Sequence, residues 1–246
     1  MDTARATSFG AWADEYDEWR PSYPDDAVDW LLPAPGRRVA EVGAGTGKLT
    51  DRLIARGVAP DDLDVVEPDA RMLAVVRGRH PGVRTHVAGA ADLPLEDASV
   101  DAVVVADAWH WFPKAEAVAE VSRVLRPDGW LGCTWNVPVL ERDWEWRALR
   151  LRPELHRPVD LDPLQRLDVT TGTAETGVFR WTWDLTPRQW RGFVSTVSHV
   201  RLLPEDECAA ALDETEALVA RACAEAGTET PPLVHDALCV RWRPSR

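Results

Sequence analysis

Short apolar runs alternate with amphipathic segments along the first half of this 246-residue chain, and this alternation most constrains its fold. The apolar runs have the length and β-branched content of buried strands. They cover residues 38–42, 63–67, 83–87, 100–106 and 130–136. Between them, apolar residues recur at helical spacing over residues 47–57, 68–79 and 115–129. Strands and helices in this alternation predict a parallel sheet with helices on both faces.

The second half of the chain departs from this alternation. We predict helices over 142–155, 186–201 and 204–227, and strands over 177–185 and 235–244. Thr186 and Pro187 suit the N-cap and the first turn of the helix that they begin. Residues 8–31 are amphipathic and rich in aromatic residues, which indicates two short helices. Because no repeat or linker interrupts the pattern, we expect one domain over residues 1–246.

Composition argues against several classes of partner. The formal net charge is -13 at pH 7, whereas binding of a nucleic-acid backbone needs a basic surface, so we expect no nucleic-acid partner. No apolar run approaches the ~18 residues of a membrane-spanning helix, so we expect no membrane partner. The four cysteines and six histidines are scattered, which favours neither a disulfide framework nor a metal site. These features predict a cytoplasmic protein.

The stretch EVGAGTGKLT, residues 41–50, places three glycines in alternation after the first predicted strand. A Walker A loop would need glycine at position 42 and Ser or Thr after Lys48, where the chain has Val42 and Leu49. A dinucleotide fingerprint would need its third glycine at position 48. The remaining pattern, E-x-G-x-G-x-G, suits a ligand without a pyrophosphate, because glycine lets the backbone approach closely.

A second acid lies at the end of the second predicted strand. Glu67 follows Gly43 by 24 residues. A carboxylate at this place can accept hydrogen bonds from both hydroxyls of a ribose. The glycine loop and Glu67 together predict a nucleoside-binding site at the carboxyl ends of the strands.

Four segments together resemble the successive motifs of class I S-adenosylmethionine-dependent methyltransferases. They are VAEVGAGTGKLT (39–50), VVEPDARML (65–73), LPLEDASVDAVVVADAWHWF (93–112) and AEVSRVLRPDGWLG (119–132). Two further segments, YDEWRPSYP (16–24) and TPRQWRGFVSTVSHVRLLPEDE (186–207), are similar to the small-molecule branch that includes trans-aconitate-type methyltransferases. The resemblance spans nearly the whole chain.

The resemblance implies an α/β fold with a Rossmann-like seven-stranded sheet. Its expected strand order is 3-2-1-4-5-7-6 with the last strand antiparallel, flanked by helices. A helical cap is expected from the N-terminal segment and from the residues after the fifth strand. The family pattern divides the chain into a cofactor-binding core (35–137), cap and acceptor elements (1–34 and 138–176), and closing strands and helices (177–246).

The resemblance also assigns residues to the cofactor S-adenosylmethionine. The residues expected to face its methionine part are Glu41, Gly43, Ala44 and Gly45. Glu67 should hold the ribose, Pro68 and Met72 should flank the adenine, and Ala91 and Asp92 should approach the adenine edge. Tyr16, Arg20 and Tyr23 resemble family residues that close over the cofactor from the N-terminal segment. Arg20 could pair with the methionine carboxylate or with an acidic acceptor, or lie in a surface salt bridge with Asp17 or Glu18.

Asp107 and His110 follow the fourth predicted strand, at the sheet edge where ligands bind in open α/β folds. Either side chain could contact the methionine end of the cofactor or the acceptor. A neutral His110 could take a hydroxyl proton, which would give the pH–rate profile an ascending limb near ~6.5. It could instead orient the acceptor, or pack beneath the next helix.

The expected activity is methyl transfer to a small-molecule acceptor, with oxygen favoured as the acceptor atom and secondary metabolism as the setting. The resemblance also allows a homodimer. One alternative is an NAD-dependent oxidoreductase, against which stand the missing glycine at position 48 and the lack of a Tyr-x-x-x-Lys pair. Another alternative is a protein that binds S-adenosylmethionine without methyl transfer, such as a cyclase.

Overall fold

Seven strands form one mixed sheet in the computed structural model, which describes residues 12–32, 36–151 and 162–245. The strand order is β3-β2-β1-β4-β5-β7-β6. The strands are β1 (Val39–Val42), β2 (Leu63–Val66), β3 (Arg84–His86), β4 (Val100–Ala106), β5 (Leu125–Pro138), β6 (Thr173–Asp184) and β7 (Pro232–Arg243). Strands β1 to β5 pair in parallel, and β7 lies antiparallel between β5 and β6. The predicted order and the antiparallel last strand are confirmed.

Helices cover both faces of the sheet. They are α2 (Ala13–Trp19), α3 (Asp25–Leu31), α4 (Lys48–Ala55), α5 (Ala70–Arg79), α6 (Lys114–Val124) and α8 (Pro163–Leu167), with 3-10 turns η2 (Pro60–Asp62) and η3 (Trp109–Trp111). One core cluster joins α6 and α8 to one face, and a second joins α3, α4 and α5 to the other. Neighbouring residues Val103 and Val104 of β4 enter different clusters, because adjacent strand residues point to opposite faces.

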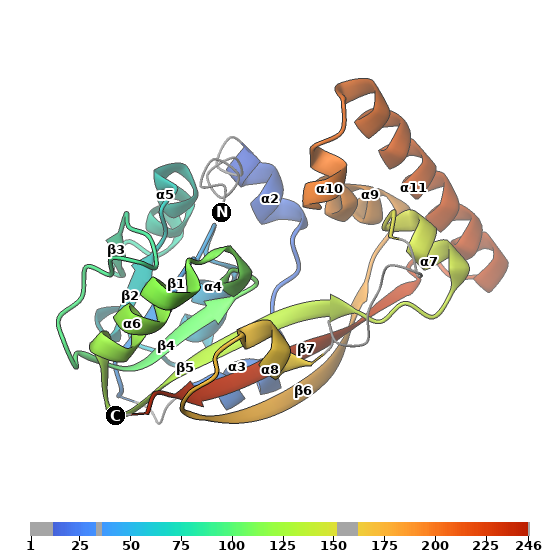
Figure 1. Ribbon diagram of the computed structural model, residues 1–246. Coiled ribbons are helices and arrows are strands. Elements are labelled where there is room, and N and C mark those ends of the chain that lie inside the picture. Colours follow the sequence, from blue (N-terminus) through green and yellow to red (C-terminus); the bar gives the residue numbers. More distant parts are fainter. Residues whose placement is uncertain (1–11, 33–35, 152–161, 246) are drawn as a thin grey trace.

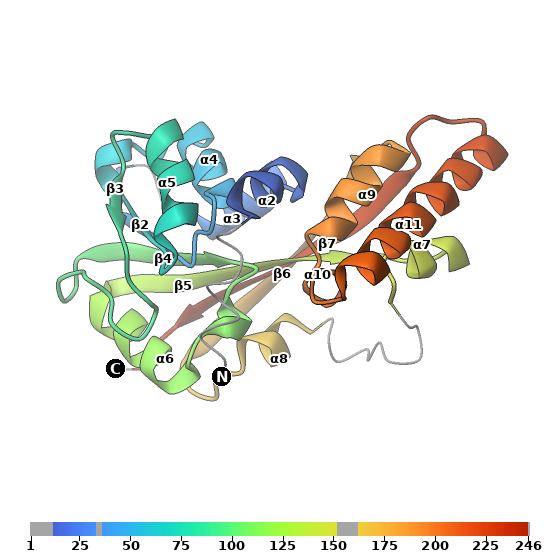
Figure 2. The same cartoon turned by 90° about the horizontal axis from the view of Figure 1, so that it is seen from above.

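A separate group of helices lies at the far end of the long strands β5, β6 and β7 (Figures 1 and 2). It consists of α7 (Asp143–Ala148), α9 (Pro187–Ser195), α10 (Ser198–Arg201) and α11 (Glu205–Ala226). Its core includes Trp190, Phe193 and Val219, and Leu233 of β7 joins it. Helix α2 contacts both α5 and α9, so it bridges the space between this helical group and the nucleoside side of the sheet.

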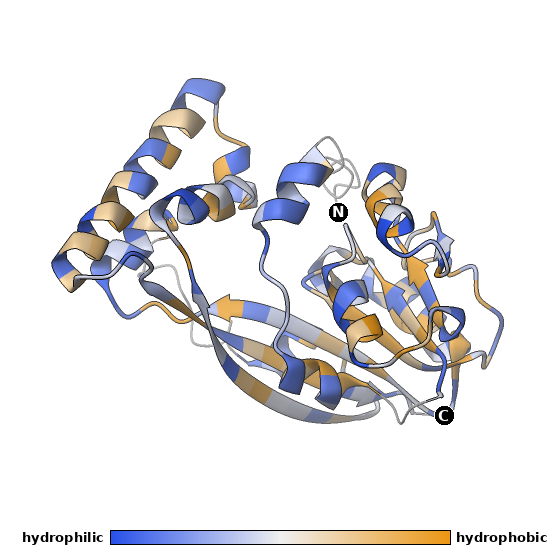
Figure 3. Cartoon of the chain, turned by 180° about the vertical axis from the view of Figure 1, so that it is seen from behind, coloured by the Kyte–Doolittle hydropathy of each residue, from blue (hydrophilic) through white to orange (hydrophobic). Residues whose placement is uncertain are grey.

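Hydropathy separates the two parts of the fold. The parallel strands are mostly hydrophobic, whereas α11 carries polar residues along much of its length (Figure 3). This agrees with strands that are buried on both faces and with a helix that packs on one side only. No helix within the described residues is long and apolar enough to cross a membrane.

One predicted helix ends earlier than expected, and another is divided into two. The helix predicted over 115–129 ends at Val124, and Leu125 already belongs to β5. Pro127 explains this end, because proline disfavours helical geometry at the preceding residue, Arg126. The helix predicted over 186–201 is divided into α9 and α10, where Thr196 donates its hydroxyl to the carbonyl of Phe193 at 2.6 Å.

The remaining boundaries differ by a few residues. Helix α7 covers 143–148 of the segment predicted over 142–155, of which 152–155 lie outside the described residues. Helices α2 and α3 confirm the two helices expected within 8–31, of which 8–11 are likewise outside the described part. The short helix α8 falls in a segment for which the sequence pattern predicted no element.

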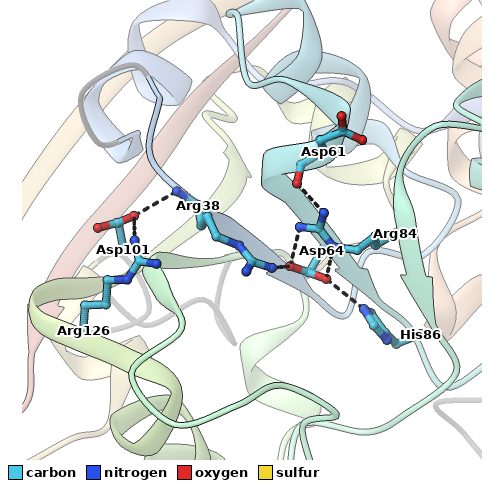
Figure 4. Close-up of polar contacts among 7 residues, drawn as sticks. All are labelled: Arg38, Asp61, Asp64, Arg84, His86, Asp101 and Arg126. Carbon is cyan, nitrogen blue, oxygen red and sulfur yellow. Dashed lines mark hydrogen bonds and ion pairs between the residues drawn. The ribbon is translucent and has the colours of Figure 1, made fainter.

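A network of ion pairs ties the amino-terminal parts of the parallel strands together (Figure 4). The buried Asp64 of β2 accepts hydrogen bonds from Arg38 (2.9 Å), Arg84 (2.9 Å) and His86 (2.9 Å). Burial alone would raise the pKa of Asp64, but the bonds from Arg84, His86 and Arg38 lower it to about 2. Nearby, Asp101 accepts from the Arg38 backbone N–H at 2.9 Å and from Arg126 at 2.7 Å. The network therefore lies opposite the edge where the glycine loop follows β1.

Candidate functional site

A cavity of about 380 Å³ opens at the carboxyl ends of β1, β2 and β4. It lies where open α/β sheets bind ligands. The sequence-predicted residues that line it are Tyr16, Arg20, Glu41, Gly43, Ala44, Gly45, Glu67, Pro68, Met72, Asp107 and His110. The structure thus brings together residues that are up to 94 positions apart, between Tyr16 and His110.

The glycine loop turns sharply after β1. Gly43, Gly45 and Gly47 have φ values of 72°, 57° and 88°, in the left-handed region that glycine adopts without strain. At Gly43 a side chain would also lack space, since a Cβ would lie 2.8 Å from Cβ of Ala108. The Gly43 N–H donates to the carbonyl of Val66 at 2.8 Å. The loop is therefore held against the end of β2, beside Glu67.

Glu67 joins the glycine loop to helix α5. Its Oε2 accepts from the Gly45 N–H at 2.9 Å, and its Oε1 accepts from the Asp69 N–H at 2.9 Å. Each carboxylate oxygen can accept more than one hydrogen bond, so both oxygens keep capacity for a ligand. Burial raises the pKa of Glu67, and the two backbone donors offset part of that rise. The carboxylate is oriented by backbone and faces the cavity.

Glu41 lies deeper, under the loop. It is 1% exposed and accepts a hydrogen bond from the Thr50 hydroxyl of α4 at 2.5 Å. Burial raises the pKa of Glu41 to about 8, although the Thr50 hydroxyl opposes the shift. At pH 7 this carboxyl group is therefore mostly uncharged.

Arg20 enters the cavity from the segment after α2. Its Nη2 donates to the Thr196 carbonyl at 3.2 Å, and its guanidinium lies 5.2 Å from the Tyr16 ring centroid. Its Nε is buried without a hydrogen-bond partner in the described parts of the chain. The expected alternative, a salt bridge with Asp17 or Glu18, is not formed; Asp17 pairs with Arg79 at 3.0 Å instead. A cation so placed is available to an anionic group of a ligand.

Asp107 ends β4 with a φ of 49°, which is uncommon for a residue other than glycine. Its Oδ2 accepts from the Tyr23 hydroxyl at 3.1 Å, and its Oδ1 accepts from the Asn136 N–H at 3.3 Å. Burial raises the pKa of Asp107 to about 6, and Arg20 and Tyr23 limit the rise. The group is thus mostly ionised at pH 7 and changes charge within the mildly acidic range.

His110 lies in the η3 turn, with its ring centroid 4.9 Å from that of Trp111. The residue is exposed and lines the cavity, although neighbouring side chains shield part of its ring from solvent. This partial burial and the nearby cations Lys114, Arg166 and Arg20 lower the pKa of His110 to about 4. The imidazole is therefore neutral at pH 7, and a pH–rate limb near ~6.5 does not follow from it. The neighbouring Trp109, by contrast, is a fully buried packing residue.

Ala91 and Asp92 do not line the cavity. Both are exposed in the loop after β3, whereas Ala90 and Leu93 beside them are buried. The loop is tied to α6, since the Leu93 N–H donates to Glu120 at 2.7 Å and Arg123 donates to the Leu93 carbonyl at 2.9 Å. Burial of the flanking apolar residues turns Ala91 and Asp92 outward.

The far end of the cavity is built from residues that the motif analysis did not single out. They are Asn136, Pro138, Leu149, Leu151, Phe193, Val197, Ser198, His199 and His235. Most are apolar or aromatic, and burial lowers the pKa of His235 to about 4, so this histidine is also neutral. The likeness of residues 186–207 to a family segment was the available signal, but it assigned no role to a particular side chain.

Comparisons with known proteins agree with this architecture. A family model described as a methyltransferase domain matches residues 40–133. An uncharacterized methyltransferase of Mycobacterium tuberculosis is 40% identical over 237 residues, which cover 95% of this chain and 94% of that protein. That relative is similar along nearly its whole length.

Two solved structures share the fold. A protein of Anaeromyxobacter dehalogenans, assigned as a type II methyltransferase, has a TM-score of 0.67 at 24% identity, over 92% of this chain and 97% of that one. Phosphoethanolamine N-methyltransferase 2 of Haemonchus contortus, solved with phosphomonomethylethanolamine and S-adenosylhomocysteine, has a TM-score of 0.55 at 14% identity, over 98% of this chain and 59% of that one. With its sheet order, its glycine loop and its 40% identical relative, the chain belongs to the class I S-adenosylmethionine-dependent methyltransferases.

Proposed function

We propose that this chain binds S-adenosylmethionine in the cavity at the carboxyl ends of β1, β2 and β4, and transfers its methyl group to an oxygen atom of a small molecule. The observation that carries this proposal is the Glu67 carboxylate, held by the Gly45 and Asp69 N–H groups and facing a cavity lined by Met72 and Pro68. A carboxylate at the end of the second strand can accept both hydroxyls of a ribose. The adenine would lie beside Met72 and Pro68.

The polar groups at the other side of the glycine loop fit an amino acid. Within the described residues Arg20 forms no ion pair and donates to the Thr196 carbonyl, and the Asp107 carboxylate accepts from Tyr23 and Asn136. A methionine part carries one carboxylate and one ammonium group, so Arg20 would hold the first and Asp107 the second. The cofactor, when bound, supplies a methyl group on a cationic sulfur that leaves readily.

His110 and the apolar residues beside it would bind the methyl acceptor. A neutral imidazole can accept a hydrogen bond from an acceptor hydroxyl, but with a pKa of about 4 it is a weak base at pH 7. We therefore assign His110 an orienting role. The apolar wall of Phe193, Val197 and Leu149 excludes water from the reacting atoms, which favours in-line transfer from a cationic donor.

This proposal is favoured over the oxidoreductase alternative. Lys48 stands where a dinucleotide loop has its third glycine, and the relative and family that match are methyltransferases, which weigh against an NAD-dependent oxidoreductase. Oxygen as the acceptor atom, the setting in secondary metabolism and a homodimer stay predictions.

Isothermal calorimetry tests the cofactor assignment. We expect S-adenosylhomocysteine to bind with one site per chain and NAD to give no heat. Binding of NAD without binding of S-adenosylhomocysteine would refute the proposal. Methyl transfer itself is tested by incubation with S-adenosylmethionine carrying a deuterated methyl group and a panel of hydroxylated small molecules, followed by mass spectrometry.

A further inference from the structure

A second cavity of about 320 Å³ lies beside the first, between helix α2 and the α9–α10 segment. Both views place these elements next to each other (Figures 1 and 2). Four residues line both cavities, namely Tyr16, Trp111, Ser198 and His199. Trp111 is also the ring neighbour of His110, at 4.9 Å between centroids. The two spaces therefore share a wall at the place where the acceptor is expected.

The residues that line the second cavity alone include two large apolar side chains and two hydroxyls, besides one ion pair. Trp12 and Leu202 are 49% and 57% exposed, which is high for large apolar residues. The hydroxyls of Ser195 and Thr196 donate to backbone carbonyls of their own segment, at 2.7 Å and 2.6 Å. Both hydroxyl groups therefore already donate a hydrogen bond within the protein. Exposed apolar side chains that line a concave pocket indicate a ligand-binding site.

The two charged groups in this wall neutralise each other. Arg201 pairs with Glu15 at 3.6 Å, and its guanidinium lies 3.6 Å from the Trp12 ring centroid. The pair carries no net charge, although Nη2 of Arg201 is buried without a hydrogen-bond partner among the described residues and can donate to a neutral acceptor atom. The cavity thus suits a mainly apolar group without formal charge.

The residues proposed to hold the nucleoside do not line this space. Glu67, Pro68 and Met72 line only the first cavity, and among the residues assigned to the cofactor only Tyr16 borders both. The second cavity is separated from the glycine loop, and it adjoins the acceptor side through Trp111 and His199. Its occupant would therefore be part of the acceptor.

We propose that the second cavity holds an apolar, uncharged extension of the methyl acceptor. The acceptor would place a hydroxyl beside His110 and extend past Trp111 into the space between α2 and α10. This rests on the proposed function, because it needs the methyl donor in the first cavity. The substrate class that follows is an amphiphilic molecule with a hydroxylated head and an apolar tail or ring system.

A series of phenols tests this assignment. Protein saturated with S-adenosylhomocysteine is titrated by calorimetry with phenol, 4-butylphenol and 4-octylphenol. We expect the affinity to rise with chain length, by up to roughly fourfold for each methylene that becomes buried. Ser195→Phe should remove this rise, because Ser195 lines only the second cavity, while phenol and S-adenosylhomocysteine bind as before.

Two further variants keep the test decisive. Arg188→Phe adds the same ring to the exposed side of α9 and should retain the chain-length effect. Leu202→Asp, at an exposed position that tolerates polarity, should weaken 4-octylphenol more than phenol. Equal affinity for the three phenols, or a rise that persists in Ser195→Phe, overturns the inference. Failure of S-adenosylhomocysteine to bind refutes the proposed function instead, and the phenol series without it still tests the cavity.

Discussion

Glu67 has two tasks at the residue scale, because it faces the proposed ribose site and also fixes the loop that surrounds it. Its two oxygens accept the Gly45 and Asp69 N–H groups at 2.9 Å each. Both donors are backbone groups, so the carboxylate is positioned without a competing cation. A ligand hydroxyl would meet an oriented, desolvated acceptor, which is where a hydrogen bond is strongest.

Replacement of Glu67 by Ala should weaken S-adenosylhomocysteine binding by about 10- to 150-fold. This corresponds to the loss of a charged hydrogen bond of ~1.5–3 kcal/mol. Calorimetry measures the affinity, and Glu96→Ala, at an exposed position outside the cavity, is the matched control. Unchanged affinity together with a lower melting temperature would show that Glu67 serves the loop alone.

Asp107 should make cofactor binding depend on pH. Its pKa is raised to about 6, so the carboxylate proposed to hold the ammonium group is present above pH 6 and is lost as the pH falls below it. We expect the affinity for S-adenosylhomocysteine to fall by up to about tenfold per pH unit below 6. Calorimetry between about pH 5 and 8 measures this dependence.

Two variants assign that dependence to its source. Asp107→Asn should bind weakly and lose the step near pH 6. His110→Ala should keep the step, because the pKa of His110 is lowered to about 4 and lies outside this range. Glu41→Gln should also keep it, since the pKa of Glu41 is raised to about 8. A step that disappears only in His110→Ala would contradict this assignment.

At the element scale, helix α2 connects the two sides of the cavity. Toward the sheet, Asp17 pairs with Arg79 of α5 at 3.0 Å, and Arg79 also pairs with Asp51 of α4 at 2.9 Å and donates to the Thr46 carbonyl of the glycine loop. Toward the helical group, Arg20 donates to Thr196. The position of Tyr16 over the cavity thus depends on side chains of α5 and α4 and on the backbone carbonyl of Thr196.

Arg79→Met should loosen α2 and the glycine loop together. Each partly exposed ion pair contributes ~0.2–1 kcal/mol, so we expect S-adenosylhomocysteine affinity to fall by roughly two- to fivefold. Hydrogen exchange followed by mass spectrometry should show faster exchange over residues 13–19. Arg77→Met, which removes an exposed bond to Thr85, is the control. Equal exchange in the two variants would mean that α2 is held by its apolar contacts.

At the scale of the whole molecule, the two ends of the parallel strands have different roles. The carboxyl ends of β1, β2 and β4 carry the cavity, and the amino-terminal parts carry the Asp64 network. A buried carboxylate shared by Arg38, Arg84 and His86 ties three neighbouring strands. This network therefore ties the strands together at the end opposite the ligand cavity.

Asp64→Asn should lower the free energy of unfolding at pH 7 by roughly 1–3 kcal/mol, since charged hydrogen bonds to a buried group are lost. The pKa of Asp64 is lowered to about 2 from an ordinary value of ~3.9. Its contribution is complete above pH ~4 and is lost as the pH falls toward 2.

Urea unfolding of the wild type and the variant at pH 7 and at lower pH measures this contribution. The difference between them should shrink as the pH approaches 2. Asp128→Asn, at an exposed position, should leave stability within ~0.5 kcal/mol. A difference between wild type and Asp64→Asn that stays constant with pH would show that the network does not depend on the ionised carboxylate.

Periodicity and short motifs in the sequence determine a large part of this protein. The strand and helix segments of residues 38–106 lie within a few residues of their predicted bounds, because apolar spacing reports burial directly. Gly43 and Glu67 could be placed in a ligand site from spacing alone, since each follows a strand and parallel strands end at one edge. The helix predicted over 115–129 ends early, at Val124, and Pro127 in the sequence accounts for this end.

Only the tertiary structure determines which distant side chains complete the cavity and how they are charged. Phe193, His199 and His235 reach it because α9 and α10 pack at the far end of the long strands and β7 lies between β5 and β6, and no local pattern encodes that arrangement. The pKa of His110 falls to about 4 because burial and cations from other segments surround it. Ala91 and Asp92 turn outward because their neighbours are buried against α6. Desolvation and Coulomb interactions depend on distances in space, and these arise only when separate elements pack together.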